Sequence, residues 1–146
     1  MSVIDAAQQF SDAQAMAASS AAVTQSTNVI DTTEAKTIKG AWGTSIDNQI
    51  GGSVWNILVT TAINATTVIT AKLMTHSAAT SIASGTEIAE IVLPAAAAKG
   101  VKRAVQLPIG QQVAERYLGV TYTVSGAKCT AGAIESWLGA DNEVPG

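Results

Sequence analysis

Residues 116–125 constrain the fold more than any other part of the sequence. Apolar side chains occupy every second position, and small or polar side chains stand between them. The apolar positions are Leu118, Val120, Tyr122 and Val124. Successive side chains of a β-strand point to opposite sides, so a two-residue period is typical of a strand with one buried face. The segment therefore predicts a strand that packs against a second layer.

Shorter runs of the same kind recur along the chain, separated by Gly, Pro, Asn and Ser. We expect about eight strands, at 28–31, 37–42, 53–60, 69–73, 88–93, 101–107, 116–125 and 128–138. The runs at 53–60 and 69–73 read as a hairpin or meander pair. No segment predicts a helix of three turns. The pattern predicts an all-β fold, an antiparallel β-sandwich in which eight strands would suit a jelly roll.

The first 27 residues differ in composition from the rest. They are rich in Ala, Ser and Gln, and their isolated large apolar anchors before Met16 are Ile4 and Phe10. Such a segment has too little apolar surface to fold alone, so we expect an N-terminal arm that orders on contact with a partner. A frayed terminus is the alternative. Residues 28–140 form the predicted sandwich domain, and 141–146 a polar C-terminal tail.

Charge excludes some classes of function. Only 13% of the residues are charged, against about 25% in an average protein, and the formal net charge is −3. The one cationic cluster is Lys99, Lys102 and Arg103, so nucleic-acid binding is not expected. The apolar stretch 54–74 alternates and contains Lys72, which argues against a membrane span. Residues 1–5 do not resemble a signal peptide.

The motifs of common catalytic sites are missing from the sequence. No Gly-rich phosphate loop and no Gly-x-Ser-x-Gly elbow is present. Glu87 and Glu90 are three residues apart, so a strand would place them on opposite faces. Cys129 and His76 are single and lie in no recognisable catalytic motif, and a structural zinc site needs about four ligands. We expect no enzyme activity, no cofactor and no metal.

The three tryptophans have different expected places. Trp55 lies in phase with Ile57, which indicates the core, whereas Trp137 suits a subunit contact. Trp42, between Gly40 and Gly43, is the best candidate for exposure. A carbohydrate-binding β-sandwich module would expose a row of aromatic side chains and is the alternative function. A hydrolase on a sandwich is a third, more remote one.

The chain as a whole resembles the jelly-roll cement proteins of tailed bacteriophages, of the type found on the Bordetella phage head. The order and spacing of several segments carry the resemblance rather than any single motif. These segments are Phe10–Ala15 with Ser26–Asp31, Ser84-Gly85 with Ile88–Leu93, Leu107–Gly110 with Glu115–Gly126, and Thr130–Gly132.

This resemblance implies a structural virion protein. It implies a homodimer or homotrimer on the outer surface of a capsid, bound to the major capsid protein and bridging its subunits so that the shell is stabilised. It implies neither catalysis nor a cofactor. Within this reading, the expected contacts with the capsid or with other subunits are made by Ile4, Phe10, Trp42 and Trp137.

Overall fold

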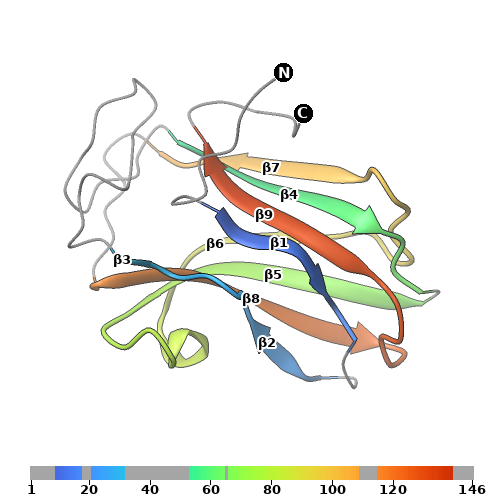
Figure 1. Ribbon diagram of the computed structural model, residues 1–146, viewed down its shortest axis with the longest axis horizontal. Helices are drawn as coiled ribbons and strands as arrows, with labels where there is room; N and C mark the ends of the chain where they lie inside the picture. Colours follow the sequence, from blue (N-terminus) through green and yellow to red (C-terminus); the bar gives the residue numbers. More distant parts are fainter. Residues whose placement is uncertain (1–8, 18–20, 32–52, 65, 109–114, 140–146) are drawn as a thin grey trace.

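A computed structural model of the chain describes residues 9–17, 21–31, 53–64, 66–108 and 115–139. These residues form two antiparallel sheets packed face to face (Figure 1). The part described contains nine strands, one short 3₁₀ helix η3 (Ile82–Ser84) and no α-helix. The predicted β-sandwich is therefore confirmed. No helix in the described residues is long and apolar enough to cross a membrane.

The first sheet has four strands in the order β1-β9-β4-β7. They are β1 (Gln9–Ala15), β9 (Ala133–Gly139), β4 (Val54–Thr61) and β7 (Lys102–Gln106). The second sheet has the order β2-β8-β5-β6, and β3 pairs with β8 as well. Its strands are β2 (Val23–Gln25), β3 (Ile30–Asp31), β8 (Tyr117–Gly126), β5 (Thr67–His76) and β6 (Thr86–Val92).

Consecutive strands of the described residues lie in different sheets, except at β2–β3 and β5–β6. This interleaving places β9 between β1 and β4 and places β8 between β2 and β5, which is the strand order of a jelly roll. The predicted pairing of 53–60 with 69–73 is wrong, because β4 and β5 belong to opposite sheets. A two-residue period shows which face of a strand is buried, but it carries no information about which strand lies beside it.

The interior holds the apolar faces that the sequence predicted. Leu118, Val120, Tyr122 and Val124 of β8 are all buried in the central cluster. Trp55 of β4 is fully buried in the same cluster. The strand predicted at 128–138 begins later, at Ala133, because Gly132 has a φ of +135°, a conformation that ends the extended backbone there.

The described part of the first 27 residues belongs to the sandwich, so the prediction of a separate arm is wrong for it. β1 pairs with β9, and Phe10 and Met16 are buried in the core. The register of β1 shifts twice, and Ala13 within it has a φ of +49°. These bulges break the two-residue period, which is why no strand was predicted here. Residues 1–8, including Ile4, lie outside the described residues, as does the tail after Gly139.

A polar network crosses the interior between the two sheets. The Tyr122 hydroxyl on β8 lies 2.8 Å from Ser11 Oγ on β1, and it also bonds the side chain of Ser136 on β9. The indole N–H of Trp55 donates to Ser136 Oγ at 3.0 Å. Burial raises the pKa of Tyr122 to about 12, so the phenol is neutral and acts as a hydrogen-bonding group. The network joins three strands of one sheet to the central strand of the other.

Two glutamines continue this network toward the surface. Ser11 Oγ donates to Gln14 Oε1 at 2.7 Å, and Gln14 Nε2 donates to the carbonyl of Gln25 on β2. Gln25 in turn bonds the carbonyl of Ala79 and accepts from the N–H of Ile82 in η3. A continuous set of bonds therefore ties β1, β2 and η3 to the centre of the fold, where every linked group has a partner.

Candidate interaction surfaces

The edges of both sheets are poorly suited to pairing with another chain. β1 is bulged, and β2 has only three residues. β6 carries Glu87 and Glu90, while β7 carries Lys102 and Arg103. Bulges, short strands and charged side chains are the usual features that block edge-to-edge pairing. The outer faces of the two sheets are therefore the better candidates for contact with a partner.

The outer face of the five-stranded sheet, which we call the valine face, is organised in rows that cross the strands. One row runs from β2 through β8 and β5 to β6 as Val23, Thr123, Thr70 and Val92, each residue paired in register with the next. The neighbouring row, two residues along, is Gln25, Thr121, Lys72 and Glu90. Val23 and Val92 are each 52% exposed and are the large apolar side chains most open to solvent in the described residues.

The charges of the valine face neutralise one another in part. Lys72 Nζ lies 3.7 Å from Glu87 Oε2 and 3.9 Å from Glu90 Oε2. These side chains are more than a third exposed, so the pairs add little to stability. η3 closes one end of the face, where Ile82 lies against Gly119 and a Cβ at residue 119 would meet its side chain at 3.1 Å. The row from Val23 to Val92 carries no charged side chain.

The outer face of the four-stranded sheet, which we call the tryptophan face, is centred on Trp137 of β9. Trp137 pairs in register with Asn56 of β4, and both side chains are fully buried. The Trp137 Nε1 and the Asn56 Oδ1 nevertheless have no hydrogen-bond partner. Lys102 Nζ lies 5.7 Å from the centre of the indole ring. One buried donor and one buried acceptor thus lie side by side on this face, and neither is satisfied.

Two carboxylates meet beside this centre. Asp12 of β1 hydrogen-bonds Glu135 of β9. Partial burial, and then the nearby charge and hydrogen bond of Asp12, raise the pKa of Glu135. This pair of carboxyl groups was not foreseen from the sequence, because the two residues are far apart in the chain and bulges in β1 set the direction of Asp12. In the described residues no group of three metal-ligating side chains forms around it.

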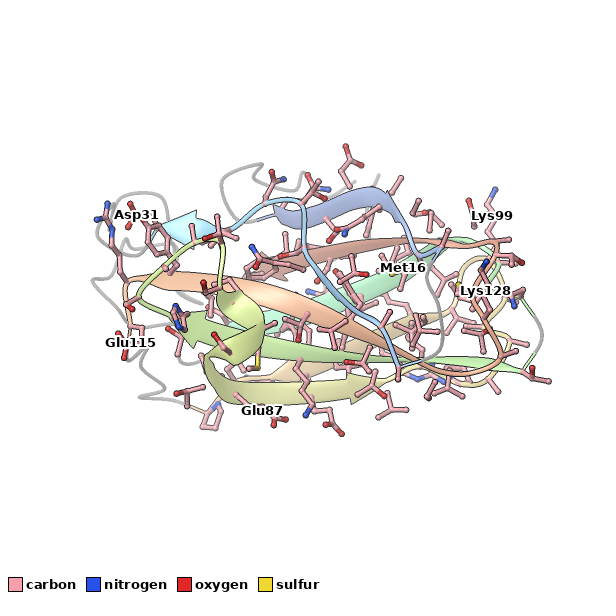
Figure 2. All side chains as sticks on the ribbon, turned by 90° about the horizontal axis from the view of Figure 1, so that it is seen from below. Met16, Asp31, Glu87, Lys99, Glu115 and Lys128 are labelled. Carbon is pink, nitrogen blue, oxygen red and sulfur yellow. The ribbon has the colours of Figure 1, made fainter. Side chains whose placement is uncertain are left out.

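Charges gather at the two ends of the sandwich. Figure 2 shows Lys99 and Lys128 at one end and Asp31 and Glu115 at the other. Arg116 makes two hydrogen bonds with the Asp31 carboxylate, at 2.9 and 3.1 Å. Charged side chains lie on the faces and edges between these ends as well, among them Lys72, Glu87 and Glu90.

The predicted contact residues fall in three different places. Phe10 is fully buried in the core, so it is not a surface contact in the folded chain. Trp137 lies on the tryptophan face, also fully buried. Ile4 and Trp42 lie outside the described residues. The sequence reasoning missed the row that ends in Val23 and Val92, because cross-strand register cannot be obtained from one sequence.

The other candidates for chemistry are structural in the described residues. The Cys129 Sγ donates to the carbonyl of Ala131, and burial raises the pKa of this thiol, which lowers its reactivity. His76 accepts a hydrogen bond from the N–H of Ala78. His76 pairs with Tyr117 at the start of β8, whereas Cys129 follows the end of β8, so the two cannot form a catalytic pair.

The large aromatic side chains that the structure describes offer no platform for a sugar. Trp55, Trp137, Tyr122 and Phe10 are all fully buried. Tyr117 is only half-buried, but it lies under the Arg116 guanidinium at 5.0 Å. A planar row of exposed rings, which a carbohydrate-binding module would need, is not formed by the described part of the chain.

Comparison with family models gives a match over most of the chain. The Bbp16 family model matches residues 10–138, which extend from the first residues of β1 to the last residues of β9. The match therefore covers both sheets and both faces described above. A search of the curated proteins finds no match.

Proposed function

The chain belongs to the Bbp16 family, a family of Bordetella phage proteins, and from this premise we propose that it is a capsid cement protein. In this proposal it binds the outer surface of the phage head, bridges subunits of the major capsid protein and stabilises the shell. The observation that carries the proposal is the family match over the whole sandwich.

A protein that resists the separation of shell subunits must transmit force without deforming. The interior polar network supports this role, because Tyr122 of one sheet is bonded to Ser11 and Ser136 of the other. Satisfied buried networks fix one arrangement of the core. The bulged, short or charged edge strands support this role as well. They hinder the addition of further strands and leave the outer faces of the sheets for contact with a partner.

We assign attachment to the shell to the tryptophan face. The Trp137 N–H and the side-chain carbonyl of Asn56 are unsatisfied but fully buried, so a local movement of this face would have to uncover them before a peptide group of the shell protein could bond them. Ala104 of β7 pairs with Asn56 and is exposed, so it lies at the accessible side of this centre. Each contact is weak alone, but a molecule that bridges two subunits gains from their combination.

The test is co-sedimentation of the purified chain with phage heads that lack it. We expect saturable binding to intact heads and no binding to free DNA or to host-cell polysaccharide. Ala104→Arg should reduce occupancy at least tenfold, because a long cation on the tryptophan face blocks close approach. Val92→Asp, on the opposite face, is the matched control. It should bind heads with the same occupancy as the wild type. Absence of saturable binding by the wild-type chain would overturn the proposal.

A further inference from the structure

The connections that join β1 to β2, β4 to β5, β6 to β7 and β8 to β9 lie at one end of the sandwich, on the right in Figure 1. The pairing of the strands brings them together, because Ala15 of β1 and Thr61 of β4 both lie opposite Ala133, at the start of β9. We call this surface the loop end. Its described residues are 16–17, 21–22, 62–64, 66, 93–101 and 127–132.

The loop end carries positive charge on a chain whose formal net charge is −3. The sequences of the four connections contain Lys99 and Lys128 and no Asp or Glu. Both lysines are exposed, and Figure 2 shows them at the same end of the molecule. In the described part of the chain, neither ammonium group pairs with a carboxylate. The carboxylates nearest to the connections in sequence, Glu90 and Glu135, each have a partner within the chain.

Hydrogen bonds between the connections fix the backbone on either side of the two lysines. Asn64 Nδ2 donates to the carbonyl of Lys128 at 2.9 Å. The N–H of Ile63 donates at 2.9 Å to the carbonyl of Ala97, two residues before Lys99. The connection between β4 and β5 therefore holds the two connections that carry lysines in fixed positions relative to each other. A surface that is already ordered loses less conformational entropy when it binds a partner.

The exposed residues around the lysines are small, so they leave room for a partner to approach the ammonium groups. They are Ala95, Ala96, Ala98, Ala127, Thr130 and Ala131.

We infer that the loop end is a docking surface for an acidic, exposed segment of the shell protein. This inference rests on the proposed function and adds a second contact to the tryptophan face. The tryptophan face covers one side of the four-stranded sheet, whereas the loop end lies across the ends of both sheets, so the two surfaces are directed at different neighbours. A molecule that bridges two subunits needs two such contacts, and complementary charges set the register of the second one.

The chemistry of the loop end favours an acidic peptide over nucleic acid. Duplex DNA presents one negative charge per about 1.7 Å of its axis, and proteins that bind it neutralise several phosphates with a track of cations. The four connections offer two cations, and their sequences contain no aromatic residue that could stack on a base. A short acidic segment needs no more than these two charges.

The test is the salt dependence of binding to phage heads that lack this protein. The first variant combines Lys99→Gln with Lys128→Gln. The matched control combines Val23→Glu with Val92→Glu on the valine face, which lowers the formal net charge of −3 by the same two units. All four side chains are exposed, so both variants should keep a native circular dichroism spectrum. We expect the lysine variant to bind heads about fivefold more weakly than the wild type at ~50 mM NaCl and equally well at ~0.5 M, because salt screens exposed charges.

The control should bind heads as the wild type does at both salt concentrations, and so should a chain with Lys99→Arg and Lys128→Arg, which keeps both charges. Unchanged affinity of the glutamine variant at low salt would overturn the inference. Equal weakening of the glutamine variant and the control would do the same, because net charge rather than the loop end would then act. Release of the wild-type chain from heads by duplex DNA, but not by a poly-glutamate peptide, would identify a nucleic-acid surface instead. Saturable binding of the wild-type chain tests the proposed function separately, whichever of these results is obtained.

Discussion

Two regions of this molecule bury polar side chains, and they do so in opposite ways. In the interior between the sheets, the indole N–H of Trp55 donates to Ser136, which also bonds Tyr122. On the tryptophan face, the indole N–H of Trp137 has no partner, although that side chain is as fully buried as Trp55. The two tryptophans lie on strands that pair with each other.

In the proposed function, this difference separates the residues that stabilise the fold from those that contact the shell. A buried N–H that lacks a partner costs about 1–3 kcal/mol, so a fold selected for stability alone would not keep one. The Tyr122 network is satisfied within the chain, whereas the Trp137 N–H and the Asn56 Oδ1 on the tryptophan face are not. The following substitutions test this contrast, beginning with the largest expected effect.

Val120→Asp tests how fully the interior excludes water. Val120 has no exposed surface and lies in the central cluster, so the carboxylate would be buried without a partner. We expect a cost of about 4 kcal/mol or more and insoluble protein. Solubility and circular dichroism measure this directly. Soluble, natively folded protein would mean that the interior face of β8 is assigned wrongly.

Phe10→Ala tests whether β1 belongs to the interior. Because Phe10 is fully buried in the core, we expect a loss of about 3–5 kcal/mol in the free energy of unfolding, measured by urea denaturation. For the same reason, a chain that starts near Gln25 should fail to fold, since it lacks β1. A change below about 0.5 kcal/mol would restore the interpretation of this segment as a separate arm.

The same substitution at the two tryptophans gives the sharpest comparison. Trp55→Phe and Trp137→Phe remove similar volumes, but only the first removes a hydrogen bond. We expect Trp55→Phe to cost about 1–3 kcal/mol more than Trp137→Phe in urea denaturation. Equal costs for the two variants would contradict the account, because they would mean that the Trp137 N–H is satisfied in the isolated chain.

Glu135→Gln should have the smallest effect and a definite pH dependence. The pKa of Glu135 is raised in the folded chain. At pH values just above the ordinary carboxyl pKa, the folded chain therefore binds more protons than the unfolded chain. As pH rises through that window, this residue lowers the free energy of unfolding. Glutamine removes this effect and can still donate to Asp12. We expect a gain of a few tenths of a kcal/mol at pH 7 that disappears below about pH 4. Thermal melting across this range is the measurement, and a gain that persists at low pH would argue against the mechanism.

The sequence predicted the sandwich and the buried faces of its longest strands, because both depend on local alternation. It did not predict β1, since the bulges around Ala13 remove the period. The pairing of β4 with β5, predicted from the short connection between them, is wrong because the jelly-roll topology places the two strands in opposite sheets. Local patterns record burial, whereas strand partners depend on contacts between distant segments.

The candidate surfaces were harder to predict for the same reason. The valine row joins residues from four strands, and the Asp12–Glu135 pair joins both ends of the chain. Trp137 stays a predicted contact residue, and its burial and its unsatisfied N–H became visible only in the assembled sheet. Phe10 was misplaced because an isolated aromatic residue in an Ala-rich segment does not show which layer covers it.

The stability of DNA-filled phage heads tests the proposed function most directly. Heads lacking this protein are heated with and without the purified chain, and DNA release is followed by the fluorescence of an intercalating dye. The account predicts that the wild-type chain raises the release temperature in proportion to its occupancy and that Ala104→Arg does not. Saturable binding with an unchanged release temperature would contradict a role in stabilising the shell.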